Sequence, residues 1–341
     1  MTVHRVEYVL HGVSISVAAA SRRLRAAADE LLRPFATATA TATGPTSTGS
    51  SVTGAPRIAV KLLSSAPPDS PPARARTWME ADGLCLLADG ATSYLLFEGV
   101  YYGRLAHRER RITLWLAHDH APDNWTIAHM LLQPLVLEAL RPNGFVAVHA
   151  AALVDAGAAV LFPAHSGSGS GKTTLALALL RAGFRLLSDG SPLLRCEEGL
   201  VVAYAFPEPL NVAATTAALF AEVAPHLPAG LQTARAEKAA LDARLVYGDC
   251  LAERAPVRAV VFPARRPAGG STLACPLPNA QALLRLLPLT MTSAAPAETG
   301  AQFQLLAHLV RDTPCYSMDT GGDFDRIPSI VRRLLRDDGA V

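Results

Sequence analysis

The sequence predicts a two-domain α/β protein, in which a smaller β-rich α+β domain precedes a larger domain of alternating strands and helices. The chain has 341 residues, which suits roughly two domains of ordinary size. Short apolar runs separated by Pro, Gly and Asp fill residues 57–116, whereas strand and helix patterns alternate after residue 145. Within the second pattern, a glycine-rich stretch follows one strand and opens a helix.

The composition narrows the class of protein. Half of the residues are hydrophobic and 18% are charged, with a net charge of +2. This balance is typical of a globular protein and provides no basic surface for nucleic acid or an anionic membrane. None of the five cysteines forms a Cys-x-x-Cys pair, which argues against a disulfide scaffold and a zinc site. No secretion signal or membrane-spanning apolar stretch is evident. We therefore expect a cytoplasmic protein that binds neither nucleic acid nor membrane.

The first domain is expected to cover residues 1–122 and to serve as an accessory or substrate domain. Strands are predicted over 6–18 and one helix over 19–33, and a small antiparallel sheet is predicted over 57–116 from strands at 58–62, 83–87, 93–98 and 111–116. Residues 36–56, rich in Ala, Thr, Gly and Ser, lack an apolar period and are expected to form a flexible insertion. A helix that starts at Asp123 or Asn124 and ends near Leu140 is expected to connect the domains through residues 123–144.

The second domain is expected to cover residues 145–341. Its first elements are predicted as strands over 145–154 and 158–162, a helix over 171–182 and a strand over 184–188. Further helices are expected near 213–224, 279–287, 301–311 and 325–336, with strands over 258–262 and 315–318.

The glycine-rich stretch has the features of a phosphate-binding loop. It consists of Ser166, Gly167, Ser168, Gly169, Ser170, Gly171, Lys172, Thr173 and Thr174. Glycines let backbone N–H groups turn toward phosphates, and the N-terminus of the next helix adds partial positive charge. Lys172 is expected to bind the β and γ phosphates of ATP, and the Thr173 hydroxyl to bind Mg²⁺. The alternative is a Gly/Ser-rich linker that contains Gly-Lys-Thr-Thr by chance.

Asp189 follows the next predicted strand. A right-handed crossover would make that strand parallel to the one before the glycine-rich loop, so Asp189 would emerge at the same sheet edge. Its carboxylate could accept the proton of an attacking hydroxyl or hold Mg²⁺. The alternative is that Asp189 only begins the turn Asp189–Pro192.

Two further residues are candidates for the same site. His149 lies in an apolar strand, where a lone histidine is more often a core residue. Lys238 is one of only three lysines among 31 basic residues, and a lysine kept among so many arginines suggests a position that needs a compact ammonium group. The alternative for Lys238 is a solvated helix face.

The run from His149 through the glycine-rich loop to Leu187-Ser188-Asp189 resembles the HPr kinase/phosphorylase family. It is most similar to the HPr-kinase-related serine kinases of bacterial gene clusters for ribosomally made, modified peptides such as lasso peptides. Later segments look like the related kinases in order and spacing: 206–210, 237–242, 258–263 and 313–316. The family carries paired acids after the strand, and the second position here is Gly190.

The resemblance implies a P-loop core like that of phosphoenolpyruvate carboxykinase and of the HPr kinase C-terminal domain. It also implies a serine kinase that uses ATP and Mg²⁺, acts on a peptide or protein acceptor and forms a homo-oligomer. Asp189 would be the general base and a metal ligand, while His149, Lys172 and Lys238 would orient or neutralise the phosphates. An alternative function, which a single Asp189 followed by Gly190 permits, is a nucleotide-binding regulator with weakened catalysis.

Overall fold

The computed structural model describes residues 3–36, 56–117, 122–163, 171–206, 208–228, 238–265, 270–290 and 296–336. It is a mixed α/β protein with two main sheets. The chain divides into two compact units: Met1–Phe145 with Thr292–Gly300, and Val146–Met291 with Ala301–Val341. None of the helices in the described ranges has both the length and the apolar character needed to cross a bilayer.

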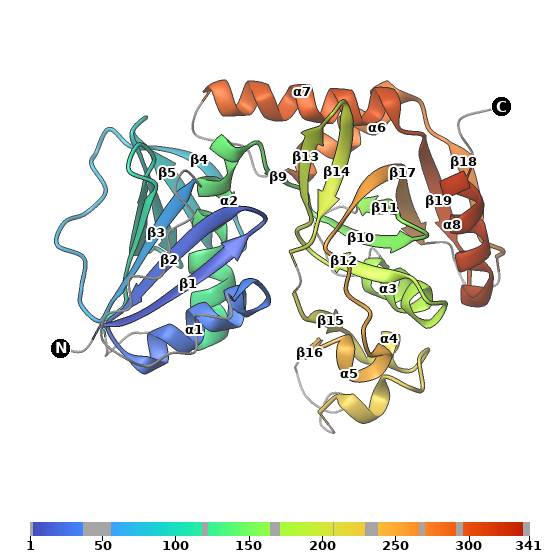
Figure 1. The fold of residues 1–341 in the computed structure, drawn as a ribbon, viewed down its shortest axis with the longest axis horizontal. Coiled ribbons are helices and arrows are strands. Elements are labelled where there is room, and N and C mark those ends of the chain that lie inside the picture. Colours follow the sequence, from blue (N-terminus) through green and yellow to red (C-terminus); the bar gives the residue numbers. More distant parts are fainter. Residues whose placement is uncertain are drawn as a thin grey trace. The chain divides into compact units, whose positions relative to one another are not determined.

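The first unit is built on one large sheet, of which strands β1 to β5 are labelled in Figure 1. Counted over the described residues, this sheet has eight strands in the order β1-β2-β3-β8-β7-β6-β5-β4. Its strands are β1 (His4–Leu10), β2 (Val13–Ala19), β3 (Arg57–Leu63), β4 (Arg76–Ala81), β5 (Leu84–Ala88), β6 (Thr92–Phe97), β7 (Val100–Ala106) and β8 (Arg111–Trp115). Its helical elements are α1 (Arg22–Leu32), η1 (Arg33–Phe35), η4 (Thr126–Leu132), α2 (Gln133–Leu140) and η5 (Arg141–Asn143).

The prediction of an antiparallel sheet over residues 57–116 is wrong at β3, whereas the pairs from β4 to β8 are antiparallel as predicted. Strand β3 pairs in parallel with β2 on one side and with β8 on the other. The helix α1 lies between β2 and β3 in the chain, and a crossover helix of this kind returns the chain in the same direction. Ser21 caps α1 by accepting a hydrogen bond from the backbone N–H of Leu24 at 3.3 Å.

The predicted connecting helix consists of two segments. A π-helical stretch, η4, runs over Thr126–Leu132 and continues as α2 over Gln133–Leu140. The side chain of Asp123 accepts a hydrogen bond from the N–H of Thr126 at 2.7 Å, so the predicted acidic cap is present. The sequence of α2 is mostly apolar around the whole helix, and every residue of α2 is buried.

The second unit combines a nine-stranded sheet and a two-stranded sheet in the described residues. Its strands are β9 (Val146–Ala147), β10 (Ala150–Asp155), β11 (Ala158–Pro163), β12 (Arg185–Ser188), β13 (Leu193–Glu197), β14 (Leu200–Tyr204), β15 (Leu210–Val212), β16 (Ala239–Leu241), β17 (Arg254–Arg265), β18 (Leu273–Pro276) and β19 (Cys315–Thr320). Its helices are α3 (Lys172–Arg181), α4 (Ala214–Ala217), η6 (Ala224–His226), α5 (Arg244–Tyr247), α6 (Asn279–Leu286), η8 (Leu287–Leu289), α7 (Pro296–Asp312), η9 (Phe324–Arg326) and α8 (Ile327–Arg336), of which α7 begins in the first unit.

Helices cover both faces of the larger sheet of this unit. Alternate residues of a strand point to opposite faces. Ala151 and Leu153 of β10 therefore share one apolar cluster with α3 and α8, whereas Ala150 and Ala152 share another with α6 and α7. Strands buried on both faces read as continuous apolar runs, which is the pattern of β10 and β11 in the sequence.

Two predicted elements differ from those observed in this unit. The strand predicted over 145–154 is interrupted between β9 and β10, and His149 lies at the interruption. The helix predicted over 213–224 is formed only at Ala214–Ala217, followed by turns to Val223. Both Phe220 and Val223 are fully buried, so packing of these side chains determines the local backbone more than the helix propensity of the alanines does.

Candidate active site

The helix α3 begins at a backbone conformation that favours glycine. Gly171, its N-cap, has φ 84° and ψ 3°, a left-handed conformation that residues with a Cβ adopt at a cost. Its carbonyl accepts the first helical hydrogen bond from the N–H of Leu175 at 2.9 Å. Residues 175–180 are buried in the core, which anchors the helix and leaves its N-terminal N–H groups available to an anion.

Lys172 and Thr173 form the first turn of α3, and Thr173 contacts Asp189. The Thr173 hydroxyl donates a hydrogen bond to Oδ2 of Asp189 at 2.8 Å. Strand β10 pairs antiparallel with both β11 and β12, so β12 runs in the same direction as β11 and ends at the same edge. The predicted direction of the strand before Asp189 is therefore confirmed, with β10 inserted between the two strands.

The carboxyl of Asp189 is buried and incompletely paired. Asp189 as a whole is 8% exposed. Burial raises the pKa of Asp189 to about 6, although the Thr173 hydrogen bond and the charges of Lys172 and Lys238 lower it. Within the described residues, Oδ1 of Asp189 has no hydrogen-bond partner. A buried acceptor without a partner is costly, so this atom is suited to bind a ligand.

The turn after Asp189 is capped by Ser188 rather than by Asp189. Oγ of Ser188 accepts hydrogen bonds from the N–H groups of Gly190 at 3.2 Å and Ser191 at 3.0 Å. Separately, the carbonyl of Gly190 accepts a hydrogen bond from the N–H of Ala150 at 3.1 Å. The interpretation of Asp189 as a residue that only begins a turn is therefore wrong, because Ser188 makes those contacts and Asp189 contacts Thr173.

His149 lies beside Lys172. Nζ of Lys172 is 2.7 Å from Nε2 of His149, and the ammonium donates when that ring nitrogen is unprotonated. His149 is exposed rather than part of the core, and its backbone N–H donates to the carbonyl of Leu289 at 2.7 Å. Burial lowers the pKa of Lys172, as does Lys238, while the carboxylates of Asp189 and Glu208 raise it. The interpretation of His149 as a core residue is wrong.

Lys238 and Glu208 come from segments that flank the two-stranded sheet. Lys238 is exposed and directly precedes β16, which pairs with β15, so the interpretation as a helix-face residue is wrong. Its charge acts on both Lys172 and Asp189. Glu208 lies two residues before β15, with its carboxylate against Gly190. The sequence interpretation gave Glu208 no role, and an acid between Pro207 and Pro209 was the available signal.

The remaining predicted residues divide into two groups. Thr174 makes its side-chain hydrogen bond with Oγ1 of Thr216 in α4 at 3.2 Å, so its hydroxyl connects α3 to α4. The other predicted phosphate-binding residues lie outside the described ranges, and their roles stay predictions: Ser166, Gly167, Ser168, Gly169 and Ser170.

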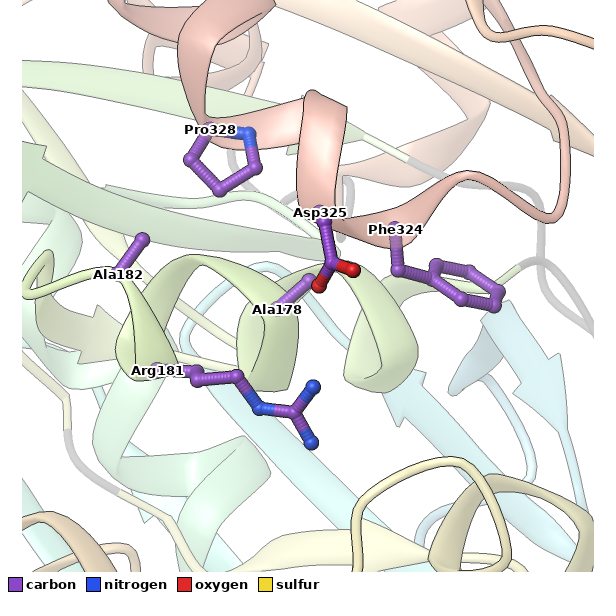
Figure 2. A pocket seen from close by; sticks show the side chains of 6 residues that line it. All are labelled: Ala178, Arg181, Ala182, Phe324, Asp325 and Pro328. Atoms are coloured by element: carbon purple, nitrogen blue, oxygen red, sulfur yellow. The ribbon is translucent and has the colours of Figure 1, made fainter.

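A small cavity lies at the opposite end of α3. It has a volume of about 190 Å³ and lies between α3, η9 and α8 (Figure 2), lined by Ala178, Arg181, Ala182, Phe324, Asp325 and Pro328. Arg181 donates two hydrogen bonds of 2.8 Å to Glu222. Nine residues of helix separate Arg181 from Lys172, a rise of about 13 Å. This cavity is therefore distinct from the cluster around Asp189.

No protein-family model and no curated protein matches the sequence. Among solved structures, the chain is similar to the HPr(Ser) kinase/phosphatase from Coxiella burnetii, at 16% identity over 56% of this chain and 94% of that chain. The TM-score of that comparison is 0.30. The likeness is partial and distant, and neither a shared fold nor a shared function follows from it.

Proposed function

We propose that this chain is a kinase that transfers the γ-phosphate of ATP to a serine hydroxyl of a peptide or protein. The observation that carries the proposal is the convergence of Lys172, Thr173 and Asp189 at the N-terminus of α3, where Oδ1 of the buried Asp189 has no partner in the described ranges. A cation, a hydroxyl and a buried acid at a helix N-terminus are the groups that phosphoryl transfer requires.

The phosphates would lie against the first turn of α3. The free N–H groups there carry partial positive charge. Lys172 would add a positive charge: burial lowers its pKa, while the neighbouring carboxylates of Asp189 and Glu208 favour the ammonium form. His149 lies 2.7 Å from that ammonium and would fix its direction.

The side chains also fit a magnesium ion. The Thr173 hydroxyl and Asp189, with its unpaired Oδ1, are oxygen ligands of the kind that Mg²⁺ prefers. In the described residues no group of three or more His, Cys, Asp or Glu forms a metal cage, and Mg²⁺ in kinases uses one or two carboxylates together with substrate phosphates. When bound, Mg²⁺ would neutralise charge on the phosphates.

Asp189 would act as the general base. The serine oxygen forms a bond to the γ-phosphorus as the bond from that phosphorus to the β–γ bridging oxygen breaks, and ADP leaves. The hydroxyl proton passes to the carboxylate of Asp189. A pKa of about 6 leaves most of this carboxylate ionised at neutral pH while keeping it basic enough to accept a proton. Lys238 would add a second positive charge.

The finer parts of the proposal rest on the sequence resemblance. They are a core like that of the HPr kinases and phosphoenolpyruvate carboxykinase, an acceptor peptide that is a ribosomally made natural-product precursor, and a homo-oligomer. Direct measurement of phosphate transfer does not depend on any of these parts, so it tests the activity first.

The test is transfer of labelled γ-phosphate to a peptide library with serine, threonine or alanine at a fixed position. Lys172→Ala should lower transfer about 100-fold or more, because the variant lacks the positive charge that would stabilise the transferred phosphoryl group. Asp189→Asn should lower it by about 100-fold or more through loss of the base, with nucleotide affinity largely kept. Lys61→Ala and Asp249→Asn, both at exposed positions, are the matched controls.

Two results would contradict the proposal. If Lys172→Ala bound nucleotide as tightly as the wild type, the phosphate site would be elsewhere. If the wild type bound ATP with Mg²⁺ but transferred no phosphate to any peptide of the library, the chain would instead be a nucleotide-binding regulator.

A further inference from the structure

His149 lies where the chain passes from β9 to β10, and two other segments hold the backbone there. On one side, the N–H groups of its neighbours Val148 and Ala150 donate to carbonyls of the turn that follows Asp189, at 3.2 and 3.1 Å. On the other side, the N–H of His149 itself donates to the carbonyl of Leu289 at 2.7 Å. The place of the His149 ring therefore depends in part on where Leu289 lies.

Leu289 is the last residue of the short helix η8, and Thr290 follows it. Thr290 forms an isolated antiparallel bridge with Val148. Leu289 lies in the same apolar cluster as Val148 and Ala150. Leu289 and Thr290 are each 6% exposed, so this pair of residues packs against the chain next to His149.

The side chain of Thr290 is the centre of a buried chain of hydrogen bonds. Its hydroxyl donates to the carbonyl of Leu287 at 2.9 Å and accepts a hydrogen bond from Nε2 of Gln302 at 2.6 Å. A hydroxyl can do both, because it has one proton and two lone pairs. Gln302 is 3% exposed and belongs to α7. These hydrogen bonds thus connect α7 to the segment that contacts His149.

The surroundings of Gln302 indicate a role in geometry rather than in stability. Leu305 and Leu306, one turn further along α7, belong to the apolar cluster that also contains Leu289. Replacing both Gln302 and Thr290 by apolar side chains of the same shape would be nearly neutral for stability. A hydrogen bond, unlike apolar burial, is directional, so the polar pair fixes one arrangement of the two segments.

We infer that Thr290 and Gln302 are positioning residues of the phosphate site, because they fix the backbone of His149. Through His149 they set the direction of the Lys172 ammonium, whose Nζ lies 2.7 Å from Nε2 of His149. The inference rests on the proposed function, in which Lys172 binds the phosphates. An ammonium on a long side chain loses much rotamer freedom when it is held in one direction, and a fixed partner meets part of that cost before the nucleotide binds.

The first test observes the contact between His149 and Lys172 without nucleotide. In protein labelled with ¹⁵N-histidine, the Nε2 resonance of His149 is identified by its loss in His149→Ala, and Lys172→Ala gives its position without the ammonium. Thr290→Val removes the hydroxyl and keeps the shape of the side chain, so the resonance should move toward its position in Lys172→Ala. Gln302→Met should move it in the same direction. Thr290→Ser, which keeps the hydroxyl, should leave it in place.

The second test is a double-mutant cycle on nucleotide affinity. Affinity for a non-hydrolysable ATP analogue with Mg²⁺ should fall about fivefold in Thr290→Val and at least as much in His149→Ala. The double variant should bind the analogue no more weakly than His149→Ala, because Thr290 acts through His149 and the effects of coupled residues do not add.

Thr313→Val and Gln304→Met are the matched controls. Thr313 is also a buried threonine, and it precedes β19. Strand β19 is parallel to β17, and β17 is parallel to β11, so Thr313 lies at the sheet edge opposite the one where β11 ends. Gln304 is an exposed glutamine of α7. Neither control should change the resonance or the affinity.

An unmoved His149 resonance in Thr290→Val or in Gln302→Met would overturn the inference. So would additive losses of affinity in the cycle, which would mean that Thr290 supports the fold rather than His149. If Thr290→Val does not fold, Gln302→Met takes its place in the cycle. None of these results touches the proposed function, which fails instead if Lys172→Ala binds the analogue as tightly as the wild type.

Discussion

At the scale of single residues, Asp189 illustrates a conflict between stability and chemistry. Its carboxyl is 8% exposed, and only one of its two oxygens has a hydrogen-bond partner in the described part of the chain. Such a group is expensive to keep ionised in the absence of ligand, which is why burial raises its pKa to about 6. The same desolvation makes the carboxylate a better base and strengthens its interaction with a cation.

We expect Asp189→Asn to stabilise the ligand-free protein at pH 7.5. The folded pKa of about 6 exceeds the usual value of 3.8, so the stability linked to this proton is complete below pH 3.8 and is lost as the pH rises through 6. An amide avoids that loss, and the shift corresponds to about 3 kcal/mol at most. Urea unfolding in EDTA should show the gain at pH 7.5 and a smaller one at pH 5.

The same measurement on Asp249→Asn serves as control. The side chain of Asp249 is 93% exposed, so its amide should leave the free energy of unfolding nearly unchanged at both pH values. An Asp189→Asn variant that is less stable than the wild type at pH 7.5 would mean that the carboxylate is well compensated in the folded protein and that its pKa is not raised.

At the scale of elements, the start of α3 combines a left-handed backbone at Gly171 with the proposed phosphate-binding surface. Gly171 holds φ 84°, and a Cβ at this position would contact nothing within 4 Å among the described residues. Any effect of a substitution there is therefore conformational rather than steric. The left-handed N-cap turns the chain into the helix directly before Lys172 and Thr173, the residues that would bind phosphate in the proposed function.

We expect Gly171→Ala to lower the free energy of unfolding by about 1–2 kcal/mol, because alanine pays the cost of the left-handed conformation. Gly171→Asn should cost less, because asparagine tolerates this conformation better than alanine. Chemical denaturation of both variants provides the comparison. Equal stability of Gly171→Ala and the wild type would show that the N-cap can adopt another conformation without cost.

The elements differ in how far the sequence predicted them. The strand before the glycine-rich stretch, the helix after it and the following strand that ends before Asp189 were predicted correctly, because periodicity, capping and turn signals are local. The parallel pairing of β3 with β2 and β8 was missed. Pairing partners lie far apart in the chain, and apolar alternation shows that a strand has a buried face without showing which strand lies beside it.

At the scale of the whole molecule, the chain forms two compact units, each with its own sheet. The three tryptophans, Trp78, Trp115 and Trp125, all belong to the first unit. The candidate site residues Lys172, Asp189 and Glu208 belong to the second. Tryptophan fluorescence therefore reports on one unit while nucleotide is expected to bind the other.

We expect heat to unfold the protein in more than one transition, as is usual for chains with separate cores. ADP with Mg²⁺ at 100 times its dissociation constant should stabilise the second unit by about 2.7 kcal/mol. The transition seen by circular dichroism should then rise in temperature more than the one seen by tryptophan fluorescence. Equal shifts in both signals would show that the two units unfold as one.

The sequence by itself determined the strand that ends at Pro163 and the helix that begins with Lys172 and Thr173, and it located Asp189 at the end of the next strand. Those features lie within the 32 residues from Ala158 to Asp189 and follow from local hydrogen bonding and side-chain periodicity. The tertiary structure alone decided that His149 contacts Lys172 and that Glu208 fills the space beside Gly190. These contacts join segments through the order of strands in the sheet, which depends on how the cores pack and not on any local pattern.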